Sequence, residues 1–261
     1  MRAFAYLVGT AIAMASAVSA TGILIPLYIW PADDSTWRPV YNAISSYPDI
    51  LFQVIVNPDS GPGGTTYPDE NLITGVAKLN SYDNVQVIGY VATDYAERDF
   101  SEVDSQISTY SGWSAYTTKN ITVSGIFFDE APSTNDDTKI SYMQGISATA
   151  KSSNLNTVIF NPGTKLEPGS ATEYFKAADL IVEFEKSYSA WLSAIPANEF
   201  SANGTYYKDA VILYGAPLKA NYDDVIHEAQ TMGLGAAYLT ESDDYMSVDT
   251  VPKVAASFVA Q

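Results

Sequence analysis

The sequence lacks several of the side chains on which common protein chemistry depends. Its 261 residues include no cysteine and one histidine, and only 13 lysines and arginines stand against 30 aspartates and glutamates. The absence of cysteine excludes disulfides, thiolate metal sites and a cysteine nucleophile. One imidazole cannot build a multi-histidine zinc site, and a formal net charge of −17 opposes binding to phosphate backbones. We therefore expect no nucleic-acid partner, no metal and no organic cofactor.

The side chains that remain abundant suit the binding and cleavage of polar substrates. Tyrosine occurs 19 times and tryptophan four times, alongside the many carboxylates. The single histidine, His227, falls in a predicted helix far from any strand end. We therefore assign it to the surface or to helix packing, and we look for acid–base chemistry among the carboxylates.

The first 20 residues have the organisation of a secretory signal peptide. Arg2 precedes a short apolar run, and small residues occupy the last positions before residue 21. We predict cleavage there, which leaves residues 21–261 as a single catalytic domain; a signal anchor or a buried helix is the alternative. The sequons at Asn120 and Asn203 fit a secreted glycoprotein, extracellular or associated with the cell wall. No second apolar run is long enough to span a membrane, and we expect a monomer.

From residue 22 onward, short runs rich in Val, Ile, Phe and Tyr alternate with segments of helical periodicity. The predicted strands are Gly22–Trp30, Leu51–Asn57, Val85–Val91, Val123–Asp129, Thr157–Asn161, Leu180–Glu185, Ala210–Tyr214 and Gly235–Leu239. The predicted helices are Thr36–Tyr47, Asp69–Asn80, Glu102–Tyr116, Asp136–Ser152, Ala171–Ala178, Tyr222–Met232 and Val248–Val259, with an irregular stretch over Ala190–Lys208. Strands that are apolar on both faces and separated by helices indicate a covered parallel sheet. Eight such units predict an α/β fold, the (β/α)8 or TIM barrel.

An open, doubly wound sheet is the alternative architecture. Such a sheet usually carries a glycine-rich phosphate loop after its first strand, where this chain has Trp30 and Pro31. The glycine-containing turn at residues 60–64 lacks a lysine and is followed by no clear helix, so it does not suit phosphate either. The barrel is the favoured fold, and it predicts an active site at the carboxyl ends of the strands.

Two adjacent acids, Asp129 and Glu130, end the fourth predicted strand. They directly follow the apolar residues Phe127 and Phe128. Carboxylates are costly to bury there unless they face a polar cavity, so we favour a catalytic role over helix capping. Neighbours on a strand alternate faces, so either the strand bulges or one acid supports the other.

Two further acids, Glu183 and Glu185, lie on the sixth predicted strand. A period of two places both on one face, opposite an apolar face, and directs them into the barrel. Glu185 is nearer the strand end and is expected at the mouth, with Glu183 deeper as a supporting acid; an outward-facing Glu183 is the alternative. The ends of strands four and six can face each other across a cleft, and carboxylates placed that way suit glycosidic bond cleavage.

Several motifs resemble the Spherulin-4 family in their order and spacing. They are Tyr28–Pro31, Val54–Gly63, Leu79–Asn80, Val87–Thr93, Gly125–Pro132, Phe160–Thr164 and Phe184–Tyr188. This family overlaps glycoside hydrolase family 135, secreted fungal (β/α)8 enzymes that cleave α-1,4-linked N-acetylgalactosamine within galactosaminogalactan, an exopolysaccharide. The resemblance implies that the family's acids fall on Asp129, Glu130 and Glu185. Glu183 and Lys186 depart from the family pattern, in which an apolar residue and an asparagine are usual.

Together, these features predict a secreted glycoside hydrolase of the endo-α-1,4-N-acetylgalactosaminidase type. Its catalytic candidates are Asp129, Glu130 and Glu185, with the roles of acid and nucleophile left open. The residues predicted to line the cleft and bind substrate are Tyr28, Trp30, Asn57, Tyr90, Asn161 and Tyr188. The expected partner is a polysaccharide, including a partly deacetylated, cationic galactosamine polymer that the negative field would attract. The alternative is a non-catalytic glycan-binding protein of the cell surface or spore wall; deacetylation is disfavoured because it generally needs a metal held by imidazoles.

Overall fold

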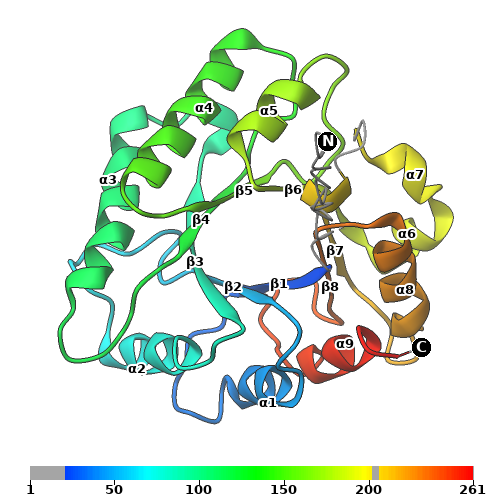
Figure 1. The fold of residues 1–261 in the computed structure, drawn as a ribbon, viewed down its shortest axis with the longest axis horizontal. Coiled ribbons are helices and arrows are strands. Elements are labelled where there is room, and N and C mark those ends of the chain that lie inside the picture. Colours follow the sequence, from blue (N-terminus) through cyan, green and yellow to red (C-terminus); the bar gives the residue numbers. More distant parts are fainter. Residues whose placement is uncertain (1–20, 202–205, 261) are drawn as a thin grey trace, which may run out of the picture.

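The fold is a closed ring of eight parallel strands surrounded by helices (Figure 1). The computed structural model describes residues 21–201 and 206–260. Each strand pairs with its neighbours in chain order, and the last strand pairs with the first. The predicted (β/α)8 barrel is therefore confirmed.

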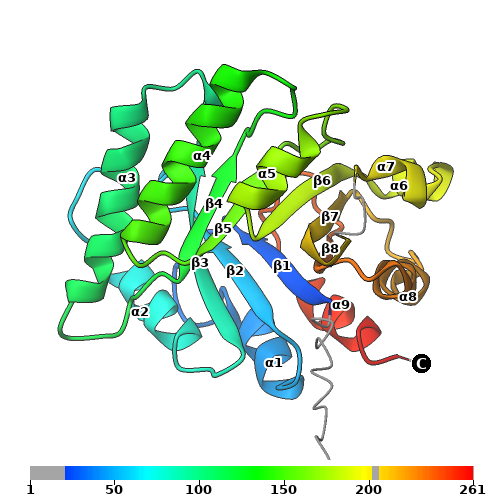
Figure 2. The ribbon, with the colours of Figure 1, turned by 45° about the horizontal axis from the view of Figure 1, so that its top comes forward.

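The elements follow the predicted order, with ends shifted by a few residues. The strands are β1 (Gly22–Leu27), β2 (Phe52–Val56), β3 (Val85–Ala92), β4 (Gly125–Asp129), β5 (Thr157–Asn161), β6 (Leu180–Ser187), β7 (Asp209–Tyr214) and β8 (Ala236–Leu239). The helices are α1 (Arg38–Ser46), α2 (Glu70–Leu79), α3 (Phe100–Gly112), α4 (Asp137–Ser152), α5 (Ala171–Ala177), α6 (Tyr188–Ser193), α7 (Pro196–Glu199), α8 (Tyr222–Met232) and α9 (Val251–Ser257), with short 3-10 turns η1 (Asp94–Ala96), η2 (Trp113–Ala115) and η3 (Tyr206–Lys208). Helices α6 and α7 occupy much of the stretch expected to be irregular. Figure 2 shows α3, α4 and α5 on one side of the ring and α6, α7 and α8 on the other.

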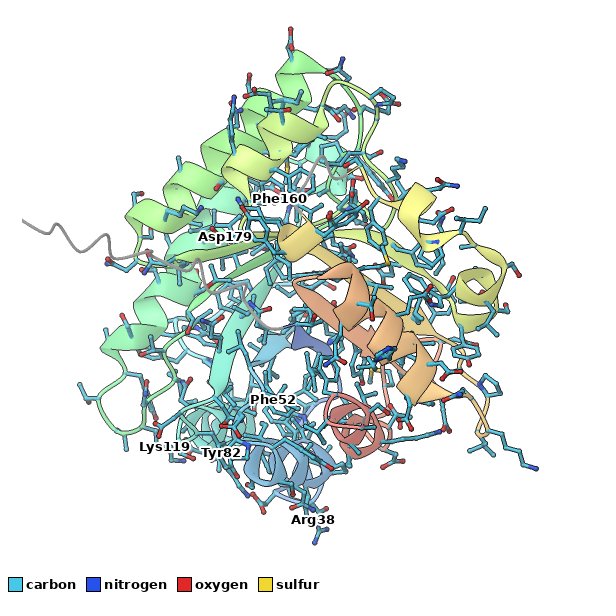
Figure 3. All side chains as sticks on the ribbon, turned by 45° about the vertical axis from the view of Figure 1, so that its right-hand side comes forward. Arg38, Phe52, Tyr82, Lys119, Phe160 and Asp179 are labelled. Carbon is cyan, nitrogen blue, oxygen red and sulfur yellow. The ribbon has the colours of Figure 1, made fainter. Side chains whose placement is uncertain are left out.

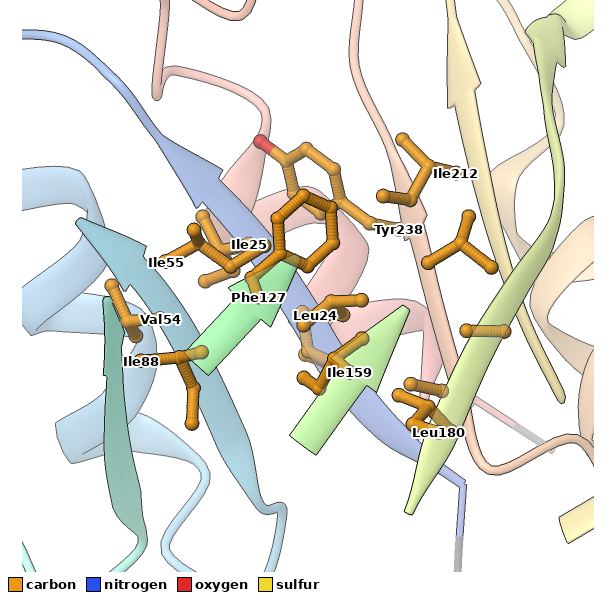
Figure 4. Packing of buried hydrophobic residues seen from close by; sticks show 14 of the residues in the cluster. Leu24, Ile25, Val54, Ile55, Ile88, Phe127, Ile159, Leu180, Ile212 and Tyr238 are labelled. Atoms are coloured by element: carbon orange, nitrogen blue, oxygen red, sulfur yellow. The ribbon is translucent and has the colours of Figure 1, made fainter. Parts of the chain in front are cut away.

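Alternate residues of the strands fill the interior of the barrel. The register places Phe127 beside Tyr90 on one side and beside Ile159 on the other. Phe127 and Ile159 are buried among aliphatic side chains from several strands (Figure 4). Two residues further along the same strands come Asp129 and Asn161, which are also register partners. An apolar plug thus supports polar side chains at the carboxyl end of the barrel.

The outer face of the strands packs on the helices through aromatic rings. Phe128 and Phe160 meet edge to face with ring centres 6.0 Å apart, and Phe160 meets Tyr174 of α5 at 6.4 Å. Figure 3 shows Phe160 within the molecule and the charged side chains of Arg38 and Lys119 at its edge. Because Phe128 faces outward, the residues on either side of it face the barrel interior.

Strand β6 contains an irregularity that the hydrophobic pattern does not reveal. Its register with β7 shifts between Val182 and Phe184, which makes Glu183 an extra residue. The prediction that Glu183 shares the inward face of Glu185 is therefore wrong. The buried Glu183 carboxylate accepts hydrogen bonds from the Leu166 N–H at 2.9 Å and the Ser201 N–H at 2.7 Å. It joins the β5–α5 loop to the segment that follows α7.

Two features expected from the sequence lie outside the described residues: the predicted signal peptide (residues 1–20) and the sequon at Asn203. Asn120 is exposed in the connection between α3 and β4, where its Oδ1 accepts a hydrogen bond from the Thr122 N–H at 3.1 Å. Within residues 21–201 and 206–260, none of the helices combines the length and apolar character needed to cross a bilayer.

Asp209 should make the stability of the fold depend on pH. It is fully buried, and neither carboxyl oxygen has a hydrogen-bond partner among the described residues. Burial, followed by the charge of Glu183, raises the pKa of Asp209 to about 9. The folded protein therefore holds a proton that the unfolded chain releases near pH 4, and stability falls as pH rises between these values, by up to about 1.4 kcal/mol per pH unit.

Asp209→Asn carries a neutral side chain at every pH and should remove this dependence. We would measure denaturant unfolding at pH 5, 7 and 9. As pH rises, the free energy of unfolding of the wild type should fall relative to that of Asp209→Asn. Asp83→Asn, which changes an exposed acid, is the matched control and should follow the wild type. Parallel curves for the wild type and Asp209→Asn would contradict the prediction.

Candidate active site

The barrel register brings Asp129, Asn161 and Glu185 together at the carboxyl end of the strands. Asp129 is the last residue of β4, and Asn161 is the last residue of β5 and its direct partner. Glu185 lies near the end of β6 and pairs with Ile212 of β7, beyond the irregularity at Glu183. Three consecutive strands thus deliver one polar side chain each to the same end of the barrel, where parallel barrels place their active sites.

Asn161 bridges the two carboxylates. Its side-chain nitrogen donates a hydrogen bond to Asp129 Oδ1 at 2.7 Å and another to Glu185 Oε2 at 2.6 Å. Its Oδ1 accepts a hydrogen bond from the Gly163 N–H at 3.0 Å, which fixes the orientation of the amide. The two N–H bonds of an amide diverge by about 120°, so the Asp129 and Glu185 oxygens lie roughly 5 Å apart or less. Asn161 was predicted only to line the cleft.

Asp129 is surrounded by hydrogen-bond donors. The Tyr90 hydroxyl donates to its Oδ2 at 2.7 Å, and the Glu130 N–H donates to its Oδ1 at 2.9 Å, in addition to the bond from Asn161. These three donors fix the orientation of the Asp129 carboxyl.

Glu185 has a different environment. It is largely buried, and burial raises the pKa of its carboxyl; hydrogen bonds from Tyr245 and Asn161 lower it, and the charge of Asp129 raises it further, with a net rise. The Tyr245 hydroxyl donates to Glu185 Oε1 at 2.6 Å. Burial of Glu185 thus favours the protonated form that a general acid needs.

Tyr245 is a site residue that the sequence analysis missed. It lies on the loop between β8 and α9, six residues beyond the end of β8, in a left-handed conformation with φ of 59°. Its ring meets Tyr28 edge to face at 5.9 Å, and Tyr28 meets Tyr90 at 5.6 Å. The one sequence signal for Tyr245 is its place on the eighth strand-to-helix loop, which in the order β6–β7–β8 lies two strands from Glu185.

Glu130 lies at the rim of the site. Strand β4 is regular up to Asp129, and the chain then turns because Glu130 takes a left-handed conformation with φ of 52°. Asp129 therefore faces the mouth of the barrel while the Glu130 side chain is exposed. The charges of Asp129, Glu130 and Glu185 all raise the pKa of Tyr90, after the larger effect of its burial. All three predicted acids thus lie near enough to Tyr90 for their charges to act on it, although only Asp129 bonds to it. The turn at Glu130, and not a bulge, directs the two adjacent acids differently.

The other predicted cleft residues are engaged apart from this network. Tyr188 is buried at the start of α6, where its hydroxyl accepts a hydrogen bond from the Asn221 N–H. Asn57 Oδ1 accepts the Gly61 N–H at 3.0 Å and shapes the loop after β2. Trp30 is exposed on the loop after β1, and its Nε1 donates to Asp69 Oδ2 at 2.9 Å.

The single histidine, His227, lies outside this site, and the described residues form no metal-binding cluster. His227 is exposed on α8, away from the carboxyl ends of the strands, as its sequence position predicts. Among residues 21–201 and 206–260, His, Asp and Glu side chains form no group of three or more suited to a metal ion.

The fold and the site define a class of protein: a (β/α)8 barrel with two carboxyls, on β4 and β6, bridged by an amide on the strand between them. Comparison with known families is more specific. The chain belongs to spherulation-specific family 4, whose profile matches residues 22–261. The resemblance to the Spherulin-4 family is therefore confirmed.

Individual relatives agree with this assignment. Spherulin-4 of Physarum polycephalum is 28% identical over 228 residues, covering 84% of this chain and 63% of its own length. The chain thus spans less than two thirds of that relative. The crystal structure of Aspergillus clavatus Sph3 in complex with GalNAc is 29% identical, with a TM-score of 0.83 over 93% of this chain and 98% of Sph3. An endo-beta-N-acetylglucosaminidase from Cordyceps militaris, 8% identical with a TM-score of 0.53 over 92% of each chain, shares the barrel fold.

Tyr245 should control the proton affinity of Glu185. Its hydroxyl stabilises the ionised form of that carboxyl, so Tyr245→Phe should raise the pKa of Glu185 above its already raised value. We would follow the Glu185 carboxyl by carbon NMR during a pH titration, with Glu185→Gln to assign the signal. Tyr207→Phe, which alters an exposed tyrosine on η3, is the control. An unchanged or lower pKa in Tyr245→Phe would contradict this role.

Proposed function

We propose that this protein is a glycoside hydrolase that cleaves α-1,4 linkages in an N-acetylgalactosamine-containing exopolysaccharide of the galactosaminogalactan type. One observation supports this most directly: Asp129 and Glu185 share one amide donor, and burial raises the pKa of Glu185. Membership of spherulation-specific family 4 and similarity to Sph3, which was crystallised with GalNAc, support the choice of sugar.

The two carboxyls divide the chemistry between them. Protonated Glu185 donates its proton to the glycosidic oxygen as the bond from that oxygen to C1 breaks. Asp129 attacks C1 from the opposite face and forms a covalent ester with the sugar. Ionised Glu185 then removes a proton from water, and the resulting hydroxide attacks C1 and releases the Asp129 carboxylate. Each group ends in its starting state.

The stereochemistry of the substrate favours this route. In an α-linked 2-acetamido sugar, the acetamido group lies on the same face as the leaving group, so it cannot displace that group from behind. The protein must therefore supply the nucleophile or activate water. A separation of roughly 5 Å between the carboxyls suits a direct nucleophile, whereas a water-activating base stands roughly 6.5–9.5 Å from the acid. The shared Asn161 donor, which holds one oxygen of each carboxyl close to the other, supports the shorter separation.

Glu130 serves recognition in this scheme. Its side chain is exposed directly after Asp129, at the carboxyl end of β4. It can accept hydrogen bonds from sugar hydroxyls or pair with the ammonium group of a deacetylated residue. A signal peptide over residues 1–20 would export the enzyme to the extracellular space or cell wall, where such a polymer lies. We propose that it acts there as a monomer without a metal or cofactor.

Neutralising either catalytic acid should abolish cleavage. We expect Glu185→Gln to lower kcat on purified galactosaminogalactan by about 10²–10⁴-fold, because the leaving oxygen loses its proton donor. Asp129→Asn should lose at least as much activity, because no covalent intermediate can form. Released oligosaccharides, separated by size and quantified, give the measurement.

Asp59→Asn is the matched control for these two variants, since it neutralises an exposed acid on the loop after β2 and should retain full activity. If the wild type binds the polymer and releases no oligosaccharides, the enzyme assignment is wrong. The protein would then be the alternative, a glycan-binding component of a cell surface or spore wall.

The proposed covalent route also predicts the configuration of the product. We expect proton NMR during the first minutes of hydrolysis to show the α-anomer at the new reducing end, before mutarotation produces the β-anomer. An initial β-anomer would show direct attack by water and would reject Asp129 as the nucleophile.

A further inference from the structure

The loop after β3 contains three consecutive left-handed residues, none of them glycine. Asp94, Tyr95 and Ala96 have φ angles of 47°, 55° and 65°. The left-handed region is disfavoured for residues with a Cβ, and a run of three is rare. Strained backbone of this kind persists only where surrounding contacts enforce it, and it concentrates at functional sites.

The contacts that enforce this turn come from the candidate active site. The Thr93 hydroxyl, which is buried, donates to the carbonyl oxygens of Asp129 at 3.0 Å and Glu130 at 2.9 Å. The Tyr95 N–H donates to the Glu130 carbonyl oxygen at 2.7 Å. The turn and the rim acid Glu130 are therefore held as one unit, and the position of Tyr95 is fixed relative to the catalytic carboxyls.

A second set of contacts holds the turn from outside. Lys139, in the first turns of α4, donates to the Tyr95 carbonyl oxygen at 2.9 Å and pairs with Glu97 at 2.8 Å. The backbone of Tyr95 is thus bonded through both its N–H and its carbonyl oxygen. Its side chain, by contrast, remains 53% exposed, and within the described residues no other aromatic ring packs against it. A rigid backbone that presents an exposed aromatic ring is suited to binding a ligand with little loss of conformational entropy.

We propose that Tyr95 is an outer sugar-binding platform, on which the polysaccharide stacks a sugar unit beyond the one cleaved. This inference rests on the proposed function and extends it, because a platform outside the catalytic pair favours long chains over single sugars. Trp30 is 50% exposed on the loop after β1, and its indole is held by Asp69. Two anchored, exposed aromatic residues therefore stand on the first and third strand-to-helix loops, and Tyr95 is the one bonded directly to Glu130.

Tyr95→Asn removes the aromatic ring and should leave the fold intact. Asparagine tolerates the left-handed region better than tyrosine, so this variant should unfold at the same temperature as the wild type or higher. In a Glu185→Gln background, which binds without cleaving, we expect Tyr95→Asn to weaken binding of galactosaminogalactan oligosaccharides about tenfold, equivalent to about 1.4 kcal/mol. Binding of free GalNAc should change less than about twofold, because one sugar in the catalytic subsite does not reach the platform.

Tyr207→Asn is the matched control. Tyr207 is 52% exposed, and it lies just before β7, at the opposite end of the barrel from the mouth. It should leave oligosaccharide binding unchanged. The inference is overturned if Tyr95→Asn binds oligosaccharides as tightly as its parent, or if Tyr207→Asn weakens binding equally, while the wild type still cleaves the polymer. If the wild type neither binds nor cleaves the polymer, the proposed function fails and this inference fails with it.

Discussion

The site depends on one amide nitrogen. Asp129 and Glu185 would repel each other at their short separation if both were ionised, and Asn161 donates one hydrogen bond to each. The amide can do this because Asn161 is the register partner of Asp129, because β6 continues beyond the end of β5 to Glu185, and because Gly163 holds the amide oxygen. The barrel register, set by apolar residues deeper in the ring, therefore fixes the geometry of the carboxyl pair.

The hydrogen-bond donors around the two carboxyls are neutral, and this affects the pKa values of the carboxyls. Within the described residues, Tyr90, Tyr245, Asn161 and the backbone of Glu130 supply the hydrogen bonds, and the ion pairs involve other acids. A lysine or arginine at this position would lower the pKa of both carboxyls and keep both ionised. Neutral donors orient the carboxyls without this effect, and the pKa of Glu185 stays raised by burial. Of the many tyrosines in this acidic chain, Tyr90 and Tyr245 donate to the carboxyls, and Tyr28 packs against both of these rings.

The fold and two of the acids were predictable because they depend on local pattern. Alternating apolar runs and helices specify a barrel, and Asp129 and Glu185 follow apolar strand residues directly. The orientation of Glu183 was not predictable, because a single extra residue in β6 reverses the faces and leaves no mark in a hydrophobic pattern. Tyr188 directly follows β6, which predicted a place at the mouth of the barrel, but it is the first residue of α6 and its side chain is buried. The contact of Tyr245 with Glu185 reaches across β7 from the loop after β8, and no local pattern specifies it.

The distribution of backbone strain gives evidence about function that is independent of any relative. Seven described residues other than glycine have positive φ, and six of them lie on loops at the carboxyl ends of strands: Ser60, Asp94, Tyr95, Ala96, Glu130 and Tyr245. The seventh, Asn154, follows α4 at the other end, where asparagine commonly ends a helix. If strain reflected only imperfect loops, both ends of the barrel would share it. Its concentration around Asp129 and Glu185 indicates that the mouth is held in a conformation that the chain would not adopt for stability alone.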